Sequence, residues 1–338
     1  NKYDEHHLLA NLEQEIEKWD KNPSIGLPFY QSRLMTNICT GWDYGNLYIF
    51  GGFGGSGKTS FTFNKIIMSC IEHKEKLLII ANEQSITEFR KMLIITAMGV
   101  GTKRSINRQR LNQGNFTEKE KEKLIAAKNW IKSICDDDKL ITFVFMEDYI
   151  MEDVKKIILH YSNRGYKRVI IDTGKPSDGD YSMPRWERFT EDFKELYKLA
   201  RENGGGLNLA IWVNVQLADS ALNRRFLNEH ALGESKKIKN EASVMFMGRT
   251  VWDDEYDGEK NALTVYKFKK DTLNGYGYER VEFKLNKEDA PYYLLFTPKN
   301  RRGQDNKTGL DVLVMKPNFN NNTWEEIGFT KIIDDRSF

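Results

Sequence analysis

The sequence predicts an α/β fold in which helices cover both faces of a mostly parallel central sheet. Short, nearly continuous apolar runs recur along the chain, and helical stretches separate most of them. The first of these runs leads directly into a glycine-rich loop that opens a helix. Strands that alternate with helices in this way form a parallel sheet, because each helical crossover returns the chain to the same edge.

The individual elements follow from the spacing of apolar residues. We expect strands at residues 47–50, 77–81, 140–145, 168–172, 209–215 and 243–247. We expect helices at residues 59–70, 86–98, 117–134, 151–161 and 185–203. The pattern then changes to runs joined by turns such as Leu273-Asn274-Gly275, which predicts C-terminal antiparallel hairpins added to the sheet edge, at residues 262–268, 280–285 and 292–296.

The two ends of the chain differ from this central part. Residues 4–19 form an amphipathic pattern that ends at Asn22-Pro23, with an apolar face made by Leu8, Leu9, Leu12, Ile16 and Trp19. This helix packs either on its own domain or on a neighbouring subunit. Residues 24–44 indicate an irregular lead-in, and from residue 299 the chain turns polar and rich in asparagine. We therefore divide the chain into a linker helix (1–22), a main domain (23–298) and a tail or small appendage (299–338).

The composition is that of a soluble protein with little charge bias. The 338 residues carry a net charge of +2, so nucleic-acid contacts must come from local patches. No apolar stretch approaches the length of a membrane span. Three widely spaced cysteines favour a reducing cytoplasm and argue against a disulfide framework or a zinc cluster. Because the first residue is Asn1 rather than Met, we expect the chain to be the C-terminal piece of a longer protein.

A nucleotide-binding loop is the strongest motif. Residues 52–59 read Gly-Phe-Gly-Gly-Ser-Gly-Lys-Thr, which matches the pattern Gly-x-x-x-x-Gly-Lys-Ser/Thr between a strand and a helix. Backbone N–H groups of such a loop converge on phosphate oxygens, Lys58 reaches the outer phosphates and the Thr59 hydroxyl is placed to ligate Mg²⁺. The predicted phosphate-binding residues are Gly52, Gly54, Gly55, Ser56, Gly57, Lys58, Thr59 and Ser60.

Three further side chains are predicted at the carboxyl ends of strands, where open α/β sheets bind ligands. Asp172 ends an apolar strand and is a candidate to support Mg²⁺, although such acids also cap turns. Glu83 follows another strand and either activates the attacking water or simply opens the next helix. Gln216 follows a third strand, where its amide can hydrogen-bond the terminal phosphate.

The segment after Gln216 is basic. Residues 217–241 include Arg224, Arg225, Lys236, Lys237 and Lys239, and next to a phosphate sensor such a flexible segment is a candidate nucleic-acid contact. A solvated charged loop is the other explanation.

Taken in order, these motifs resemble the RecA-like motor domain of hexameric replicative DNA helicases of the DnaB type. The resemblance covers roughly residues 25–290. Its most specific parts are the phosphate loop, the strand ending in Asn82-Glu83, and a Gly-Glu-Ser run that begins at Gly233. It implies ATP and Mg²⁺ as cofactors, with Glu83 activating water, Asp172 supporting Mg²⁺ and Gln216 sensing the γ-phosphate. It also implies a cytoplasmic homo-oligomeric ring, a bacterial or phage source, single-stranded DNA in a central channel, and a primase or loader bound through a missing N-terminal domain.

Two departures from the family pattern affect the predicted contacts. The family's DNA-loop arginine falls on Gly233 and a loop glycine falls on Lys236, so Glu234, Lys236 and Lys237 would grip DNA differently. In the family, a Lys-x-Arg pair on a strand reaches the neighbouring subunit's γ-phosphate. Lys269 matches that lysine, whereas Asp271 stands at the arginine position. Either Lys270 or Arg280 substitutes for the arginine, or the protein hydrolyses ATP slowly.

The sequence therefore predicts an ATP-dependent replicative helicase motor that moves along single-stranded DNA and separates the duplex. Two alternatives stay open. A RecA-type recombinase shares the loop, the acid and the glutamine sensor. A nucleotide-gated ring or loader with weak ATPase activity would explain the altered Lys-x-Arg pair, because a trans arginine contributes about 10³ to 10⁵ in rate.

Overall fold

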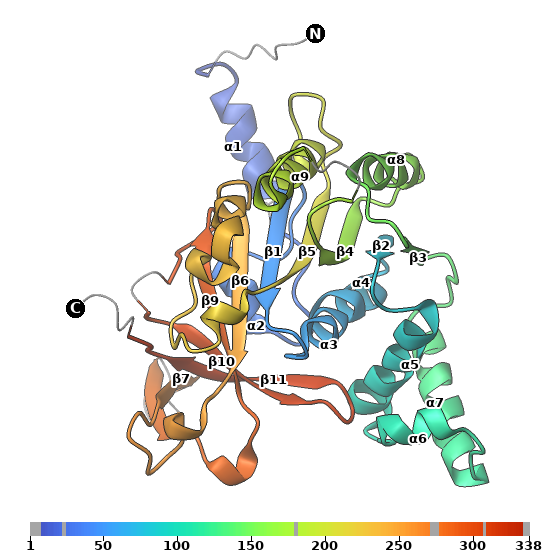
Figure 1. The fold of residues 1–338 in the computed structure, drawn as a ribbon, viewed down its shortest axis with the longest axis vertical. Coiled ribbons are helices and arrows are strands. Elements are labelled where there is room, and N and C mark those ends of the chain that lie inside the picture. Colours follow the sequence, from blue (N-terminus) through green and yellow to red (C-terminus); the bar gives the residue numbers. More distant parts are fainter. Residues whose placement is uncertain (1–7, 22–24, 179–181, 271–276, 307–308, 334–338) are drawn as a thin grey trace.

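The computed structural model describes residues 8–21, 25–178, 182–270, 277–306 and 309–333, and these form a mixed α/β fold around one large sheet (Figure 1). The sheet has eleven strands among the described residues, in the order β3-β2-β4-β5-β1-β6-β9-β10-β11-β7-β8. Their bounds are β1 Asn46–Gly52, β2 Leu77–Ala81, β3 Ile141–Phe145, β4 Arg168–Gly174, β5 Ala210–Gln216, β6 Val244–Thr250, β7 Thr264–Lys270, β8 Tyr278–Lys284, β9 Tyr293–Asn300, β10 Val312–Asn318 and β11 Thr323–Thr330.

The six strands from β3 to β6 in this order are parallel, as predicted. Successive side chains of β1 enter two different cores, because neighbouring residues of a strand point to opposite faces. Leu47 and Ile49 pack in one core with residues of α8 and α9, whereas Tyr48 and Phe50 pack in the other with residues of α2, α4 and α5. Burial on both faces explains why these strands are continuous apolar runs.

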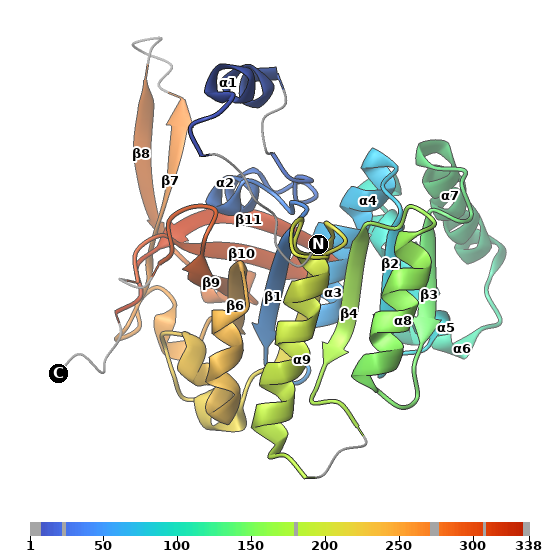
Figure 2. The same ribbon diagram turned by 90° about the horizontal axis from the view of Figure 1, so that it is seen from above.

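The helices between the parallel strands occur where the sequence predicts them, with ends that differ by a few residues. Figure 2 shows α8 and α9 together on one face of the sheet. Thr117 and Glu120 form a capping box that opens α7, which explains the sharp start of that helix. The helix bounds are α1 Leu12–Lys21, α2 Arg33–Cys39, α3 Lys58–Thr62, α4 Met68–His73, α5 Ile86–Ala97, α6 Arg108–Gln113, α7 Glu118–Ile134, α8 Met151–Ser162 and α9 Arg185–Ala200.

Several helical features differ from the sequence prediction, among them α6, which lies in a stretch where no element was predicted. The helix after the phosphate loop continues from α3 to α4 through a π-helical turn, Phe63–Ile67. The short helix α2 lies in the segment expected to be irregular. Its first backbone N–H groups, those of Leu34 and Met35, donate to the Glu326 carboxylate at 2.9 and 2.8 Å, so its cap comes from β11 rather than from a neighbour in sequence.

The C-terminal part is the main correction to the predicted organisation. Residue 299 falls inside β9, which pairs with β6 rather than with the preceding hairpin, and β10 and β11 continue the same sheet. The residues expected to form a tail or small appendage are thus integral to the domain in their described part. The hairpin of β7 and β8 is antiparallel, as predicted, and projects at the end of the sheet (Figure 2). The predicted turn at Leu273-Asn274-Gly275 lies outside the described residues.

Helix α1 lies apart from the two cores, with none of its residues buried. The apolar face predicted from the sequence is exposed in this single chain, with Leu8 at 88% and Ile16 at 59% exposure. Among the described residues, no helix combines the length and apolarity needed to cross a membrane.

A buried lysine connects the phosphate-loop helix to both ends of the main domain. The Lys65 ammonium donates to the carbonyl oxygens of Trp324 at 2.6 Å and Tyr30 at 3.1 Å. Lys65 is fully buried, and this burial lowers its pKa to about 7, with the Glu326 carboxylate acting in the opposite direction. The lead-in segment, the helix and β11 therefore meet at one titratable group.

We predict a pH-dependent loss of stability that Lys65→Met removes. The pKa of Lys65 lies near 10.5 in the unfolded chain and about 7 in the folded one, so between these values the unfolded state binds more protons. Stability from this group is present above pH 10.5 and is lost as pH falls toward 7, by as much as about 1.4 kcal/mol per pH unit. Chemical unfolding of the wild type and of Lys65→Met from pH 7 to 10 measures how the free energy of unfolding of each protein changes with pH. Equal slopes for the two proteins would contradict the lowered pKa of Lys65.

Candidate nucleotide-binding site

The phosphate loop connects β1 to α3 and has the backbone that its glycines allow. Gly55 and Gly57 have φ values of +69° and +89°, which side chains other than glycine rarely adopt. A Cβ atom at Gly52 would lie 2.7 Å from Cγ of Lys58, so this position also excludes a side chain. The Lys58 ammonium donates to the Phe53 carbonyl oxygen at 2.9 Å. Burial lowers the pKa of Lys58, and the carboxylates of Asp172 and Glu83 oppose that change.

A buried polar network fixes Asp172 beside the loop. The Thr59 hydroxyl donates to one carboxylate oxygen of Asp172 at 2.9 Å, and the Asn214 amide donates to the other at 3.0 Å. The Asn214 carbonyl oxygen in turn accepts from the Thr62 hydroxyl and the Trp212 indole N–H, each at 2.9 Å. The two residues predicted to hold Mg²⁺ are thus in direct contact, and hydroxyl and carboxylate oxygens are ligands that Mg²⁺ accepts.

The prediction from sequence missed Asn214, although a signal was present. It is the one polar residue inside the run from Ala210 to Val215, and it is fully buried. A buried amide needs hydrogen-bond partners, so its presence in an apolar strand indicates a polar network nearby.

Gln216 and Glu83 lie at the same edge of the sheet as the loop. Gln216 pairs in register with Gly52, and a Cβ atom built on Gly54 would be 3.4 Å from the Gln216 amide nitrogen. Ala81 pairs with Asp172, which places Glu83 just beyond that edge, exposed to solvent. Gln216 and Glu83 line one pocket of about 500 Å³. The structure therefore brings together the three strand-end side chains singled out from the sequence.

The Ser60 side chain faces away from this edge, contrary to the prediction that it contacts phosphate. Its hydroxyl is buried, contacts the Asn322 side chain and accepts from the Trp324 indole N–H at 3.1 Å. The ring of Phe319 also approaches the loop, because a Cβ atom on Gly57 would be 2.7 Å from it. The β10–β11 hairpin thus packs directly on the phosphate loop and its helix.

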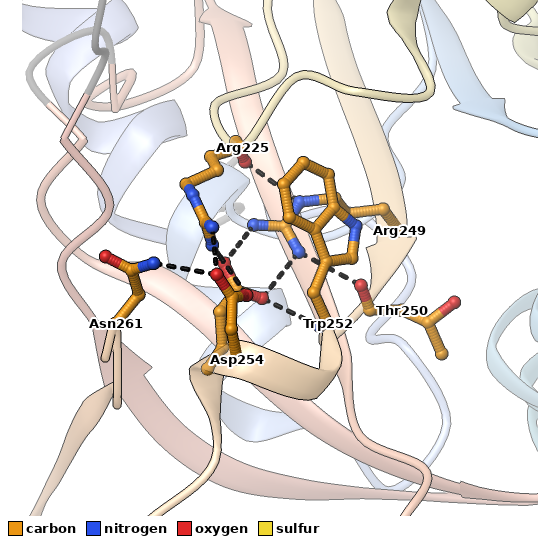
Figure 3. Close-up of polar contacts among 7 residues, drawn as sticks. Arg225, Arg249, Thr250, Trp252, Asp254 and Asn261 are labelled. Carbon is orange, nitrogen blue, oxygen red and sulfur yellow. Dashed lines mark hydrogen bonds and ion pairs between the residues drawn. The ribbon is translucent and has the colours of Figure 1, made fainter. Parts of the chain in front are cut away.

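Arg225 does not have the environment expected of a nucleic-acid contact (Figure 3). Its guanidinium donates to Asp254 and Glu255 at 3.1 Å, and Glu255 also receives two hydrogen bonds from Arg249 at 2.7 and 2.8 Å. Arg225 and Arg249 both lie against the Trp252 ring, at 4.7 and 4.6 Å from its centroid. We correct its predicted role: the ion pairs of Arg225 hold the segment after Gln216 against the residues that follow β6. Its neighbour Arg224 is half-buried.

The remaining predicted DNA-loop residues lie on a 3₁₀ segment, η4 (Glu229–Asn240). Glu234, Lys236 and Lys237 are exposed, and the Lys237 ammonium lies 4.8 Å from the centroid of the Trp186 ring. Glu234 lines the same pocket as Gln216. The segment was expected to be flexible, but it buries Phe226, Leu227, Leu232 and Ile238 in the domain core.

Lys269 is exposed on β7, opposite Glu279 of β8. Strands β6, β9, β10 and β11 separate β7 from β1 in the sheet, and Asp271 lies outside the described residues. A complete Lys-x-Arg sequence, Lys299-Asn300-Arg301, occurs instead at the end of β9. The prediction from sequence missed this pattern because it placed the boundary of the main domain just before it.

The sheet order and the loop-to-Asp172 contact define a RecA-like protein of the phosphate-loop class. Residues 30–308 match the family model described as DnaB-like helicase C terminal domain, so the chain belongs to this family and is a motor domain of the replicative helicase type. No curated protein matches the chain.

Two solved structures have a similar fold. One is described as an ATPase domain, with a TM-score of 0.71 and 17% identity over 96% of this chain and 100% of that one. The other is a DnaB-like replicative helicase described with its primase interactions, with a TM-score of 0.68 and 16% identity over 94% of this chain and 68% of that one.

Proposed function

We propose that this protein hydrolyses ATP at the phosphate loop and uses the energy to move along single-stranded DNA and separate the duplex. The observation that carries the proposal is the contact between Thr59 and Asp172 beside Lys58, with Glu83 and Gln216 in the adjoining pocket. Family membership favours this function over a recombinase, which shares the loop but pairs strands.

Each residue has a role that its position supports. Lys58 and the loop N–H groups bind the phosphates, while Thr59 and Asp172 hold Mg²⁺, which neutralises the charge on the phosphate oxygens when bound. Glu83 is exposed and lies outside the Thr59–Asp172–Asn214 network, so it is available to orient and deprotonate water. Gln216 lies between the loop and the segment that carries Glu234, so it can report the terminal phosphate to that segment.

We predict that Glu83→Gln binds ATP and Mg²⁺ but does not turn over, because an amide cannot accept the proton of the attacking water. Single-turnover hydrolysis with and without single-stranded DNA measures this effect, with Glu88→Gln on the following helix as a control at a half-buried acid paired with Lys91. The wild type should be accelerated by DNA. A wild-type hydrolysis rate that is the same with and without DNA would favour a nucleotide-gated ring or loader. Substantial hydrolysis by Glu83→Gln would mean that another residue is the base.

We also propose that Arg301, rather than Lys269, completes the site of a neighbouring subunit. Strand β9 runs antiparallel to β6, so Asn300 pairs with Val244 at the amino end of the parallel strands. The phosphate loop follows the carboxyl end of β1, at the opposite edge. Arg301 therefore lies at the edge opposite the loop of its own chain, where its guanidinium donates to the Tyr197 hydroxyl and the Asn240 carbonyl oxygen. A phosphate that it binds would thus belong to another subunit.

We predict that Arg301→Ala lowers DNA-stimulated hydrolysis by about 10³-fold or more, the effect of losing a trans arginine, while nucleotide binding is retained. Mixing Arg301→Ala subunits with Lys58→Ala subunits should restore part of the activity, because some interfaces then combine an intact loop with an intact arginine. Lys269→Ala is the comparison: a large loss there with normal turnover in Arg301→Ala would return the role to Lys269.

Assembly into a ring needs a contact between subunits, and two apolar surfaces of this chain suit each other. One is the exposed face of α1. The other is a groove of about 380 Å³ between α4, α5, α7 and β3, with apolar side chains such as Ile71, Phe89 and Leu93 in its lining. Three cations and two acids also line this groove, and α1 has four acids and two lysines, so the net charges are opposite in sign. We propose that α1 of one subunit docks in the groove of the next.

We predict that Ile16→Asp converts the assembly to smaller species, because it places a charge in the apolar contact. Native mass measurement with a non-hydrolysable ATP analogue tests this, and Gln14→Asp adds the same charge on the polar face as a control. Ile16 is exposed in the single chain, so the substitution should not unfold the domain. Rings of unchanged mass would rule out this contact.

A further inference from the structure

The hairpin of β7 and β8 presents an unusual surface. Strand β8 is the last strand of the sheet, and the pair extends beyond the body of the domain (Figure 2). Two large aromatic side chains are exposed on it, Phe268 at 58% and Tyr278 at 69%. Neither belongs to the two main cores, so their exposure has no explanation in the packing of the domain.

The strand register places these rings on one face together with cations. Phe268 is directly opposite Arg280, and Lys270 is directly opposite Tyr278. Because side chains alternate between the faces of a strand, these four residues share one face, which we name the ribbon face. The opposite face carries Val265, Val281 and Phe283, which are buried or half-buried.

Charge favours an anionic partner for the ribbon face. The ribbon face carries Lys270, Arg280 and Lys284 against the single acid Glu282, so its net charge is +2. The Arg280 guanidinium lies 4.0 Å from the centroid of the Tyr266 ring and 2.8 Å from the Glu282 carboxylate. These contacts hold the cation beside Phe268.

We propose that the ribbon face binds single-stranded nucleic acid, as a contact additional to the loop residues Glu234, Lys236 and Lys237. Bases would stack on Phe268 and Tyr278, and phosphates would pair with Lys270 and Arg280. Exposed rings between cations favour a single strand over a duplex, because only unpaired bases offer their flat faces to a side chain. This inference rests on the proposed function in one respect, which is that the single strand is taken to be DNA.

Direct binding tests this inference separately from hydrolysis. The probe is an oligothymidylate in which one base is 5-bromouracil, bound to the wild type with a non-hydrolysable ATP analogue. Light-induced crosslinks should map to peptides containing Phe268 or Tyr278. Phe268→Ala with Tyr278→Ala should weaken binding by at least about fivefold, the lower limit for losing a stacked base.

A charge-matched pair of variants separates the two faces of the hairpin. Lys270→Ala, on the ribbon face, should weaken binding and lower its dependence on salt by about one counterion. Lys267→Ala removes the same charge from the opposite face, where the ammonium lies 5.3 Å from the centroid of the Phe283 ring, and should change neither property. All of these residues except Phe283 are exposed, so thermal melting should show that each variant folds.

The outcomes distinguish the two proposals. Unchanged affinity in the double variant, or crosslinks confined to other peptides, would overturn the ribbon contact while leaving DNA-stimulated hydrolysis intact. Equal losses of affinity in Lys270→Ala and Lys267→Ala would mean that only the total charge of the hairpin matters. This result would also overturn the ribbon contact. A wild type that binds no oligonucleotide would overturn both the ribbon contact and the helicase function.

Discussion

The Asp172 carboxylate is the constraint on which the rest of the site depends. It is buried, and a buried carboxylate is stable only when other groups replace the water it loses. Thr59 does so from the helix after the phosphate loop and Asn214 from β5, and Asn214 is held in turn by Thr62 and Trp212. This network joins the loop helix to β4 and β5. The position of the loop relative to the strand ends is therefore set by hydrogen bonds as well as by packing.

Much of this arrangement could be predicted from the sequence, because local patterns determine it. The parallel strands are buried on both faces and so appear as apolar runs, and the loop has a fixed spacing of glycines, lysine and threonine. Parallel topology brings strand ends to one edge, so Glu83, Asp172 and Gln216 could be placed together from the order of the strands alone.

Other features could not be predicted because they depend on contacts distant in sequence. The cap of α2 comes from Glu326, the partners of Ser60 lie in the β10–β11 turn and on β11, and Arg225 pairs with Asp254 and Glu255. Basic residues in a polar segment look alike whether they face solvent or a buried carboxylate. An asparagine-rich stretch likewise looks like a tail, although the side chain of Asn322 is buried between Ser60 and Thr96.

The packing of the β10–β11 hairpin on the phosphate loop has a consequence for communication within an assembly. Strand β9 ends just before Arg301 and pairs with β10, whose partner β11 carries Trp324 against the loop helix. A continuous part of the sheet therefore connects a subunit's own phosphate loop to the Arg301 side chain that it would offer to the next subunit. A displacement of the loop helix would shift this part of the sheet as well. Sequential hydrolysis around a closed assembly would then need no further connecting element.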